Sequence, residues 1–159
     1  TSLTSVTIPN GVKEIGDLAF CGCPNLASIT VDEGNPVYDS REDCNAIIET
    51  ASNKLVAGCK ALVIPSSVKE IGCSALGGCA GLASITIPAS VESIGDYAMC
   101  ACDDLESVTI LSARTYIGDD LFGDCPSLKE VNVPAGTVDY YRSFFDNTFD
   151  NSIIKENII

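Results

Sequence analysis

Residues 82–104 read LASITIPASVESIGDYAMCACDD and residues 3–25 read LTSVTIPNGVKEIGDLAFCGCPN, so the two stretches agree at most of their apolar positions. Further copies of the pattern begin at Leu26, Cys59, Leu105 and Leu128. Successive copies start 23 residues apart, apart from one interval of 33 residues. A fixed period of this length is typical of a solenoid, in which each unit buries its apolar face only against its neighbours.

The shared pattern, L-x-x-[IV]-x-[IV]-P-x-x-V-x-x-I-G-x-x-[AL]-x-x-x-C, predicts one winding of the chain per copy. In the first copy Val6 and Ile8 alternate with polar residues, which indicates a short strand with one buried face. Pro9 ends that strand because proline donates no ladder hydrogen bond. We expect a second strand or bend at residues 12–15, and a Gly16 backbone conformation closed to other residues. The next stretch predicts one turn of α- or 3-10 helix, capped in different copies by Asp17, Asp96 and Asp119.

The 33-residue copy contains a predicted β-hairpin insertion at about residues 32–58. Residues 33–36 (EGNP) are a turn signal, and residues 45–49 and 54–57 predict two strands around the turn at 50–53. Insertions in solenoids lie on one face and often bind ligands. The candidate contact residues here are therefore Asp39, Arg41, Glu42 and Asp43. The alternative is a solvated hairpin that braces the stack.

The last copy departs from the pattern after Pro134, and residues 135–159 predict a C-terminal cap. Residues 138–145 predict a short amphipathic helix with four aromatic side chains. Terminal units of solenoids are atypical because they must cover the open last coil. The first copy has no such cap, so we expect it to continue a longer array or to be covered by another surface. The prediction is thus a single domain over residues 1–159, a mainly β solenoid of about six turns.

Nine cysteines fall at recurring positions, which predicts a structural role for most of them. Copies stacked about 4.8 Å apart would place the thiols of one position in an interior column of buried, reduced cysteines. That position holds Cys23, Cys79, Cys102 and Cys125. Cys21 and Cys100 share a second position but lie in non-adjacent copies, so we do not expect them to pair. C-G-C and C-A-C lack zinc-ligand spacing, and we predict no metal or cofactor.

Composition argues against several function classes. The net charge of −13 disfavours nucleic acid, and no apolar run has the ~18 residues that insertion into a membrane requires. The chain has no histidine, which excludes Ser-His-Asp and Cys-His catalysis. The pairs Asp103/Asp104 and Asp119/Asp120 are adjacent in predicted turns, with nothing to separate their pKa values. We therefore predict that the protein is not an enzyme.

The segments LTSVTIPNGVKEIGDLAFCGC and LASITIPASVESIGDYAMCAC resemble the BspA-like, treponemal-type leucine-rich repeats. NPVYDSREDCNAIIETASNKLVAGC is similar to the longer hairpin unit of that family, and VPAGTVDYYRSFF to its terminal cap. The resemblance implies a right-handed leucine-rich-repeat coil in a bacterial protein that is exposed on the cell surface or secreted, although no signal peptide is present in this chain. It also implies adhesion to host matrix or cell-surface proteins, and no catalytic residues. Leu111 and Arg114 depart from the pattern, where proline and valine are expected.

We therefore predict a binding or adhesive module for a protein ligand, and the pattern makes no prediction of oligomeric state. The outward strand positions would form a polar ladder at Ser5, Thr7, Ser28, Thr30, Ala61, Val63, Ser84, Thr86, Ser107, Thr109, Glu130 and Asn132. Serine and threonine are also ordinary solvated strand residues, so their presence alone does not establish a site. A structural spacer in a larger surface protein is the alternative function. A carbohydrate-binding module is disfavoured because Tyr38, Tyr97 and Tyr116 are dispersed in the sequence.

Overall fold

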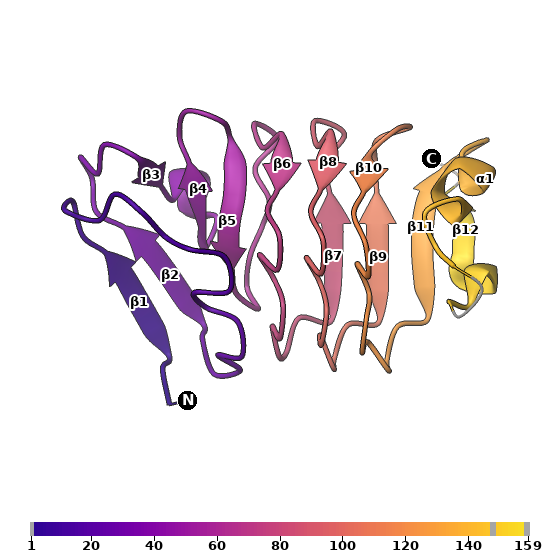
Figure 1. Cartoon of the computed structure of the whole chain (residues 1–159), viewed down its shortest axis with the longest axis horizontal. Helices are drawn as coiled ribbons and strands as arrows, with labels where there is room; N and C mark the ends of the chain where they lie inside the picture. The colour runs from indigo at the N-terminus through magenta and orange to yellow at the C-terminus, as the bar shows by residue number, and fades with distance from the viewer. Residues whose placement is uncertain (1, 147–148, 158–159) are drawn as a thin grey trace.

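The computed structural model describes residues 2–146 and 149–157, and this part of the chain winds into a stack of coils. Figure 1 shows the coils side by side along the long axis, from β1 (Ser5–Ile8) at one end to α1 (Val138–Arg142) at the other. Strands on opposite sides of the coils form three sheets. The predicted β solenoid is confirmed.

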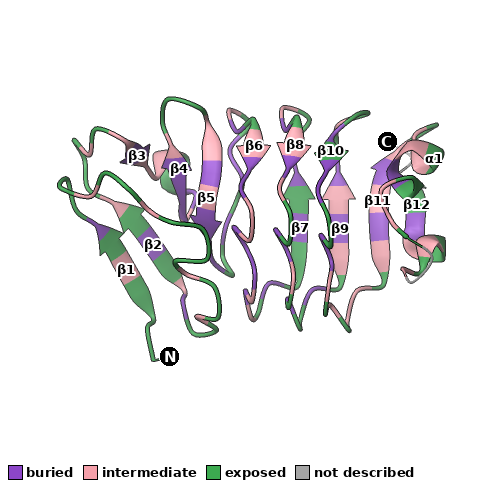
Figure 2. Ribbon diagram, in the orientation of Figure 1, coloured by how far each residue is buried: buried purple, intermediate pink, exposed green. Residues whose placement is uncertain are grey.

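The front of the stack consists of two parallel sheets. One pairs β1 with β2 (Ser28–Val31). The other has the order β12-β11-β9-β7 and contains β7 (Ser84–Ile87), β9 (Ser107–Ile110), β11 (Glu130–Pro134) and β12 (Ile154–Asn157). Strand register follows the sequence repeat, so that Ser5 faces Ser28 and Ser84 faces Ser107. Figure 2 shows buried and exposed residues alternating along β7, as the sequence pattern predicts.

The back of the stack is one six-stranded sheet with the order β10-β8-β6-β5-β4-β3. Its strands are β3 (Tyr38–Asp39), β4 (Ala46–Glu49), β5 (Lys54–Gly58), β6 (Glu70–Ile71), β8 (Ser93–Ile94) and β10 (Tyr116–Ile117). The hairpin predicted in the long copy is the antiparallel pair β4–β5. β5 then pairs in parallel with β6, so the hairpin is built into the back sheet. The 3-10 helix η1 (Arg41–Asp43) precedes it.

The long copy also breaks the front of the stack. Residues 61–64 form no strand, although their sequence repeats the pattern of β7. The N–H of Val63 donates instead to the C=O of Cys44, at 3.1 Å. Next to Cys44, the side chain of Asn45 occupies the edge of β2 and accepts a hydrogen bond from Ile29 N–H at 2.7 Å. The entry to the hairpin thus lies between β2 and the third coil, and this divides the front into two sheets.

The turns after each Ile-Gly pair are not helical, which corrects the expectation for this stretch. In residues 74–79 alternate N–H groups close local turns, as from Gly77 to Ser74 C=O at 3.0 Å. The N–H groups between them donate to the next coil, as from Leu76 to Ala98 C=O at 2.8 Å. A 3-10 helix would use every N–H internally and leave none for the neighbour. The 3-10 helices of the described chain are η1 and η2 (Asn151–Ile153).

The structure also corrects the predicted roles of the glycine and the aspartate that follow the isoleucine in each I-G-D copy of the repeat. Gly95 has no positive φ, but a Cβ there would lie 2.6 Å from the backbone N of Cys73 in the preceding coil. Glycine is therefore required for the close approach of two coils. The carboxylate of Asp96 does not cap its own turn, because Oδ1 accepts a hydrogen bond from Asp119 N–H in the next coil at 2.8 Å.

The core consists of two clusters of buried apolar side chains. The smaller one joins the first coil to the long copy and contains Ile8, Leu26, Ile29, Tyr38, Ile47, Ala57 and Cys59. The larger one runs from Cys44 to Ile154. Cys79 and Cys102 are buried in it and Cys125 packs against it, whereas Cys23 packs on the smaller cluster. The predicted thiol column is thus continuous only over the last three of its four members. All nine cysteines are free thiols.

The C-terminal cap is anchored where the sequence departs from the repeat. Tyr141 of α1 is fully buried, and its hydroxyl donates to Ser112 C=O at 2.6 Å and accepts from Thr115 N–H at 3.1 Å. The guanidinium carbon of Arg114 lies 5.3 Å from the ring centroid of Tyr140. The predicted helix is confirmed as Val138–Arg142. Strand β12, which pairs in parallel with β11, was not predicted.

Candidate binding surface

Eight serines and threonines on the front sheets point away from the core. Ser5, Thr7, Ser28, Thr30, Ser84 and Thr86 are exposed, and Ser107 and Thr109 are half-buried. Register brings equivalent hydroxyls together, and the Oγ1 atoms of Thr7 and Thr30 are 2.9 Å apart. The intervening residues, such as Ile85 and Val108, are buried. The outward hydroxyls therefore form a row of small polar groups on strands whose alternate side chains are packed in the core.

The row is interrupted at the third coil, so the expected continuous ladder becomes two patches. Val63 stands at the interruption and is 72% exposed. Val63 also lines a groove of about 340 Å³, whose other lining residues come from positions 62 and 64, from β7, and from Pro88 and Leu111. An apolar position therefore separates the hydroxyls of β1 and β2 from those of β7 and β9.

Two of the four charged candidates in the long copy are held by contacts within the chain. Arg41 donates from Nε and Nη2 to the two carboxylate oxygens of Asp39, at 2.7 and 2.6 Å. Its Nη1 also donates to Asn53 Oδ1 at 2.7 Å and to Ser67 Oγ at 3.3 Å, which links the hairpin to the third coil. Burial raises the pKa of Asp39, but hydrogen bonds from Arg41 and Thr50 outweigh it and leave the pKa below its ordinary value. These contacts favour the bracing alternative for Asp39 and Arg41, while Glu42 and Asp43 are exposed.

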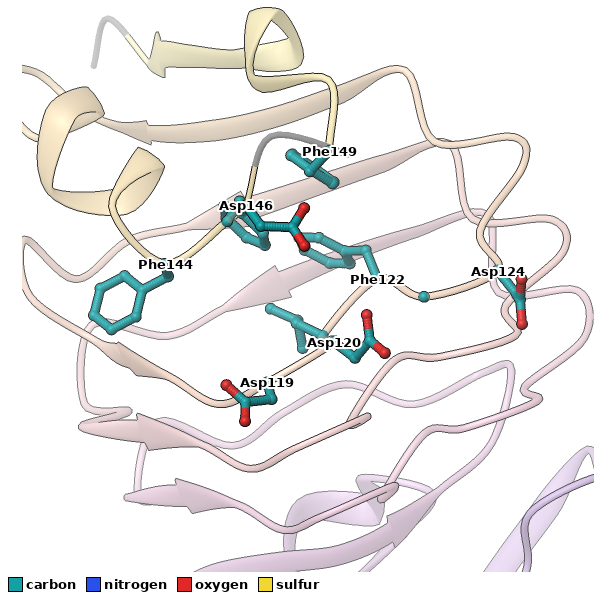
Figure 3. A pocket seen from close by; sticks show the side chains of 10 residues that line it. Asp119, Asp120, Phe122, Asp124, Phe144, Asp146 and Phe149 are labelled. Atoms are coloured by element: carbon teal, nitrogen blue, oxygen red, sulfur yellow. The ribbon is translucent and has the colours of Figure 1, made fainter.

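A cavity at the C-terminal end was missed by sequence reasoning. It has a volume of about 480 Å³ and lies between the turn at residues 119–124 and the cap (Figure 3). Phe145 and Phe149 of the cap stack at 4.3 Å between ring centroids, and both stack on Phe122 of the turn. The sequence signal for the cavity is the group of aromatic residues after position 138, whose predicted role is only to cover the core.

The thiols of Cys79 and Cys102, which are buried in the larger core cluster, offer little reactivity because the pKa of each is raised. Burial raises the pKa of Cys79 to about 12, which keeps it protonated at neutral pH. Cys102 Sγ donates to Leu76 C=O at 3.2 Å, and Cys125 Sγ to Met99 C=O at 3.0 Å. Over residues 2–146 and 149–157, no three acidic or thiol side chains gather closely enough to hold a metal ion. Nor does any helix in these ranges have the length and apolarity to cross a bilayer.

Comparison with known proteins matches the repeat directly. The family model for the BspA type Leucine rich repeat region fits six copies over residues 1–42 and 47–159. No curated protein matches the chain. A crystal structure of a leucine-rich repeat protein from Eubacterium ventriosum superposes with a TM-score of 0.72 at 27% identity, over 85% of this chain.

A crystal structure of a leucine rich cell surface protein from Faecalibacterium prausnitzii superposes with a TM-score of 0.67 at 32% identity, over 86% of this chain. The pneumococcal vaccine antigen PcpA shares the fold, with a TM-score of 0.59 at 18% identity over 82% of this chain. The chain spans 37% of the length of the Eubacterium and Faecalibacterium proteins and 39% of PcpA.

Proposed function

Because the chain belongs to the BspA-type leucine-rich-repeat family, we propose that it is a non-catalytic interaction module that binds a protein ligand through its solenoid surface. The observation that carries this proposal is the register of the outward hydroxyls, which lie on strands whose other side chains form the core. Such a surface offers many weak polar contacts on a rigid frame, which suits a broad protein interface. The absence of histidine from the sequence and the exposure of Asp103 and Asp104 support the non-catalytic part.

The proposed location is the cell surface or the secreted fraction of a bacterium. The Faecalibacterium structure described as a cell surface protein supports this, since it is 32% identical over 86% of this chain. The proposed ligands are accordingly host matrix proteins or proteins on other cells. The proposed contact residues are Glu42 and the hydroxyls of the two patches. Asp39 and Arg41 are proposed to support the 3-10 helix η1, which carries Glu42.

An array of purified host matrix proteins and glycans tests the proposal. The face variant Thr86→Lys/Thr109→Lys places two long cations on one hydroxyl patch. The control variant Ser66→Lys/Ala89→Lys adds the same charge at exposed positions outside the front sheets. We expect saturable binding to a protein on the array, lost in the face variant and kept in the control.

Equal binding by both variants would contradict the assignment of the face. Binding to no component of the array would favour the spacer function, because a spacer needs rigidity and no ligand. Binding to glycans alone would favour a carbohydrate-binding module.

A further inference from the structure

The break in the front of the stack leaves two strand edges that differ in their hydrogen bonding. One edge belongs to β2, and side chains of the long copy cap it. Asn45 Oδ1 accepts from Ile29 N–H at 2.7 Å, and Asn45 Nδ2 donates to Ala27 C=O at 3.0 Å. Ser40 Oγ accepts from Val31 N–H at 3.0 Å. The main-chain groups along this edge therefore have partners within the chain.

The other edge belongs to β7, and it has no cap. The C=O of Ile87 accepts from Leu111 N–H at 3.0 Å, so Ile87 points toward β9. Because alternate residues of a parallel strand direct their main-chain groups to opposite edges, those of Ser84 and Thr86 point toward residues 61–64. Over residues 2–146 and 149–157, no main-chain group of these two residues has a hydrogen-bond partner across this edge. The edge of β7 is therefore open to another strand.

The groove of about 340 Å³ lies at this open edge and is apolar. Ser84 and Thr86 line it together with Val63 and Leu111, which are both exposed. Val63 stands where the strands β2 and β7 carry threonine, and Leu111 stands where most copies of the repeat have proline. Two departures from the repeat thus meet at one groove, and each places an apolar side chain at its rim.

The charge beside the groove is negative. The N–H of Val63 donates to the C=O of Cys44, at 3.1 Å, which places the preceding helix η1 next to Val63. Glu42 and Asp43 of η1 are exposed. The guanidinium of Arg41, the cation of this segment, is already paired with a carboxylate of the long copy at 2.6 Å. A ligand in the groove therefore meets two carboxylates without a free cation beside them.

These features favour one kind of occupant. An extended peptide presents main-chain donors and acceptors along its length, which is what the edge of β7 lacks. A second copy of this chain is disfavoured, because its net charge of −13 would meet the same charge. Lys60 does not offset this charge at the groove, since it lies beside Gly81, which is also bonded by the carboxylate of Asp104.

We propose that the groove binds an extended peptide segment of the protein ligand, which adds a strand to the edge of β7. Aliphatic side chains of this segment pack against Val63 and Leu111, and a lysine or arginine lies beside the carboxylates of η1. Main-chain pairing gives affinity in this mode of recognition, and side-chain contacts give specificity. This mode rests on the function proposed above, and it specifies the conformation and chemistry of the ligand.

Amide hydrogen exchange of the free chain tests whether the edge is open. We expect the amides of Ser84 and Thr86 to exchange at least about tenfold faster than those of Ile85 and Ile87, which point toward β9, after correction for sequence. Equal protection of the two pairs would mean that the edge is closed in solution, and this would overturn the proposal.

Titration followed by backbone NMR tests the ligand, with the capped peptide Lys-Val-Lys-Val-Lys as the probe. We expect it to shift the amides of Ser84 and Thr86 saturably and to slow their exchange. Three altered peptides should each bind at least about fivefold more weakly. Lys-Ser-Lys-Ser-Lys lacks the aliphatic side chains, Glu-Val-Glu-Val-Glu reverses the charge, and a fully N-methylated form cannot donate to the strand. Equal binding of all four peptides, or shifts that leave these two amides unmoved, would disprove the proposed mode.

A pair of variants tests the apolar rim. Val63→Thr/Leu111→Ser removes it and retains the N–H of residue 111, and we expect the probe to bind at least about tenfold more weakly. The control Leu18→Asn/Tyr97→Asn removes two exposed apolar side chains outside the groove, at positive φ values that asparagine tolerates. The control should bind within about twofold of the parent chain. An equal loss in both variants would indicate general apolar attraction and contradict the groove.

A second pair of variants tests the charge. Glu42→Gln/Asp43→Asn should weaken binding of the probe at least about threefold. Glu14→Gln/Asp103→Asn removes the same charge at exposed positions elsewhere and should leave binding within about twofold. An equal effect of the two pairs would exclude the carboxylates of η1 from the site.

The array of host proteins separates this site from the wider function. We expect Val63→Thr/Leu111→Ser to lose the array binding of the parent chain. Full retention of that binding would overturn the groove and leave the proposed function standing. If no array protein binds the parent chain and the probe still shifts the amides of Ser84 and Thr86, the groove is supported and the proposed ligands are wrong.

Discussion

The coils at residues 3–25 and 82–104 have closely similar sequences and different surroundings. Leu82 is 2% exposed, whereas Leu3 at the same repeat position is 38% exposed. Val91 and Ile94 are buried, whereas Val12 and Ile15 are only half-buried. In the later coil, β8 pairs on both sides, with β6 and β10, and β7 pairs on one side with β9. The first coil pairs through β1 with the long copy alone. The repeat pattern thus determines how the chain winds, and the neighbouring coils determine how much burial each position gains.

Truncation of the first leucine of each coil should give the largest difference between the two coils. Leu82→Ala removes a buried side chain from the larger core, and we expect it to lower the free energy of unfolding by about 3 kcal/mol. Leu3→Ala should lower it by less than about 1 kcal/mol, because the side chain already contacts solvent. Urea unfolding of the two variants measures both values. Equal losses would mean that Leu3 is buried in solution.

Addition of a methyl group to the glycine of each Ile-Gly pair should give the next largest difference. Gly95→Ala forces a Cβ against the backbone of Cys73, and we expect a loss of about 2 kcal/mol. A Cβ at Gly16 would meet nothing within 4 Å, so Gly16→Ala should leave stability unchanged or raise it by about 0.5 kcal/mol. A destabilised Gly16→Ala variant would restore the backbone-conformation reason that we first gave for this glycine.

The glycine of the Ile-Gly pair shows which features can be predicted from the sequence and which cannot. Periodicity and turn signals predicted the solenoid, the β4–β5 hairpin and helix α1, because each of these depends on local sequence. Periodicity also marked the glycine as a fixed position. The reason for it, the close approach of Cys73 in another coil, depends on how the coils pack and is visible only in three dimensions.

The same limit explains the features that were missed. Residues 61–64 repeat the strand pattern, but the entry to the hairpin displaces them from the front sheet. Strand β12 carries no repeat pattern and pairs with β11 because the cap returns the chain to that edge. The cavity at the C-terminal end combines Phe122 with Phe149, which are brought together only by the fold of the cap. The outward hydroxyls, in contrast, were placed from the strand alternation alone.

Removal of Arg41 tests how the long copy connects the first coil to the rest of the stack. We expect Arg41→Ala to lower stability by about 1 kcal/mol at pH 7, through loss of its bonds to Asp39, Asn53 and Ser67. The pKa of Asp39 is lowered in the fold, so this contribution is present above the ordinary value of 3.8 and is lost as the pH falls through the lower folded value. Urea unfolding at pH 7 and at about pH 2.5 should therefore show the difference from the parent chain shrinking on acidification.

The exposed ion pair between Lys129 and Glu106, with 3.0 Å between Nζ and Oε1, provides the control for Arg41. Lys129→Ala should change stability by less than about 0.5 kcal/mol at neutral pH, because both partners are solvated. If Arg41→Ala lowers the free energy of unfolding no more than Lys129→Ala does, the hairpin is held by the back sheet alone. If the loss in Arg41→Ala persists at low pH, its bond to Asp39 is not the source of the stabilisation.

Replacement of the outward hydroxyls should give the smallest effects, and here the two coils should behave alike. Thr86→Val and Thr7→Val exchange a hydroxyl for a methyl group at exposed strand positions, where valine is at least as favourable as threonine. Thr7 also loses its bond to Thr30, so we expect changes within about 0.5 kcal/mol in both variants. Thermal unfolding of the two variants measures this. Equal and small changes would leave ligand binding as the property that these hydroxyls affect, whereas a large loss at Thr86 alone would mean that the regular coils use their outward face for stability.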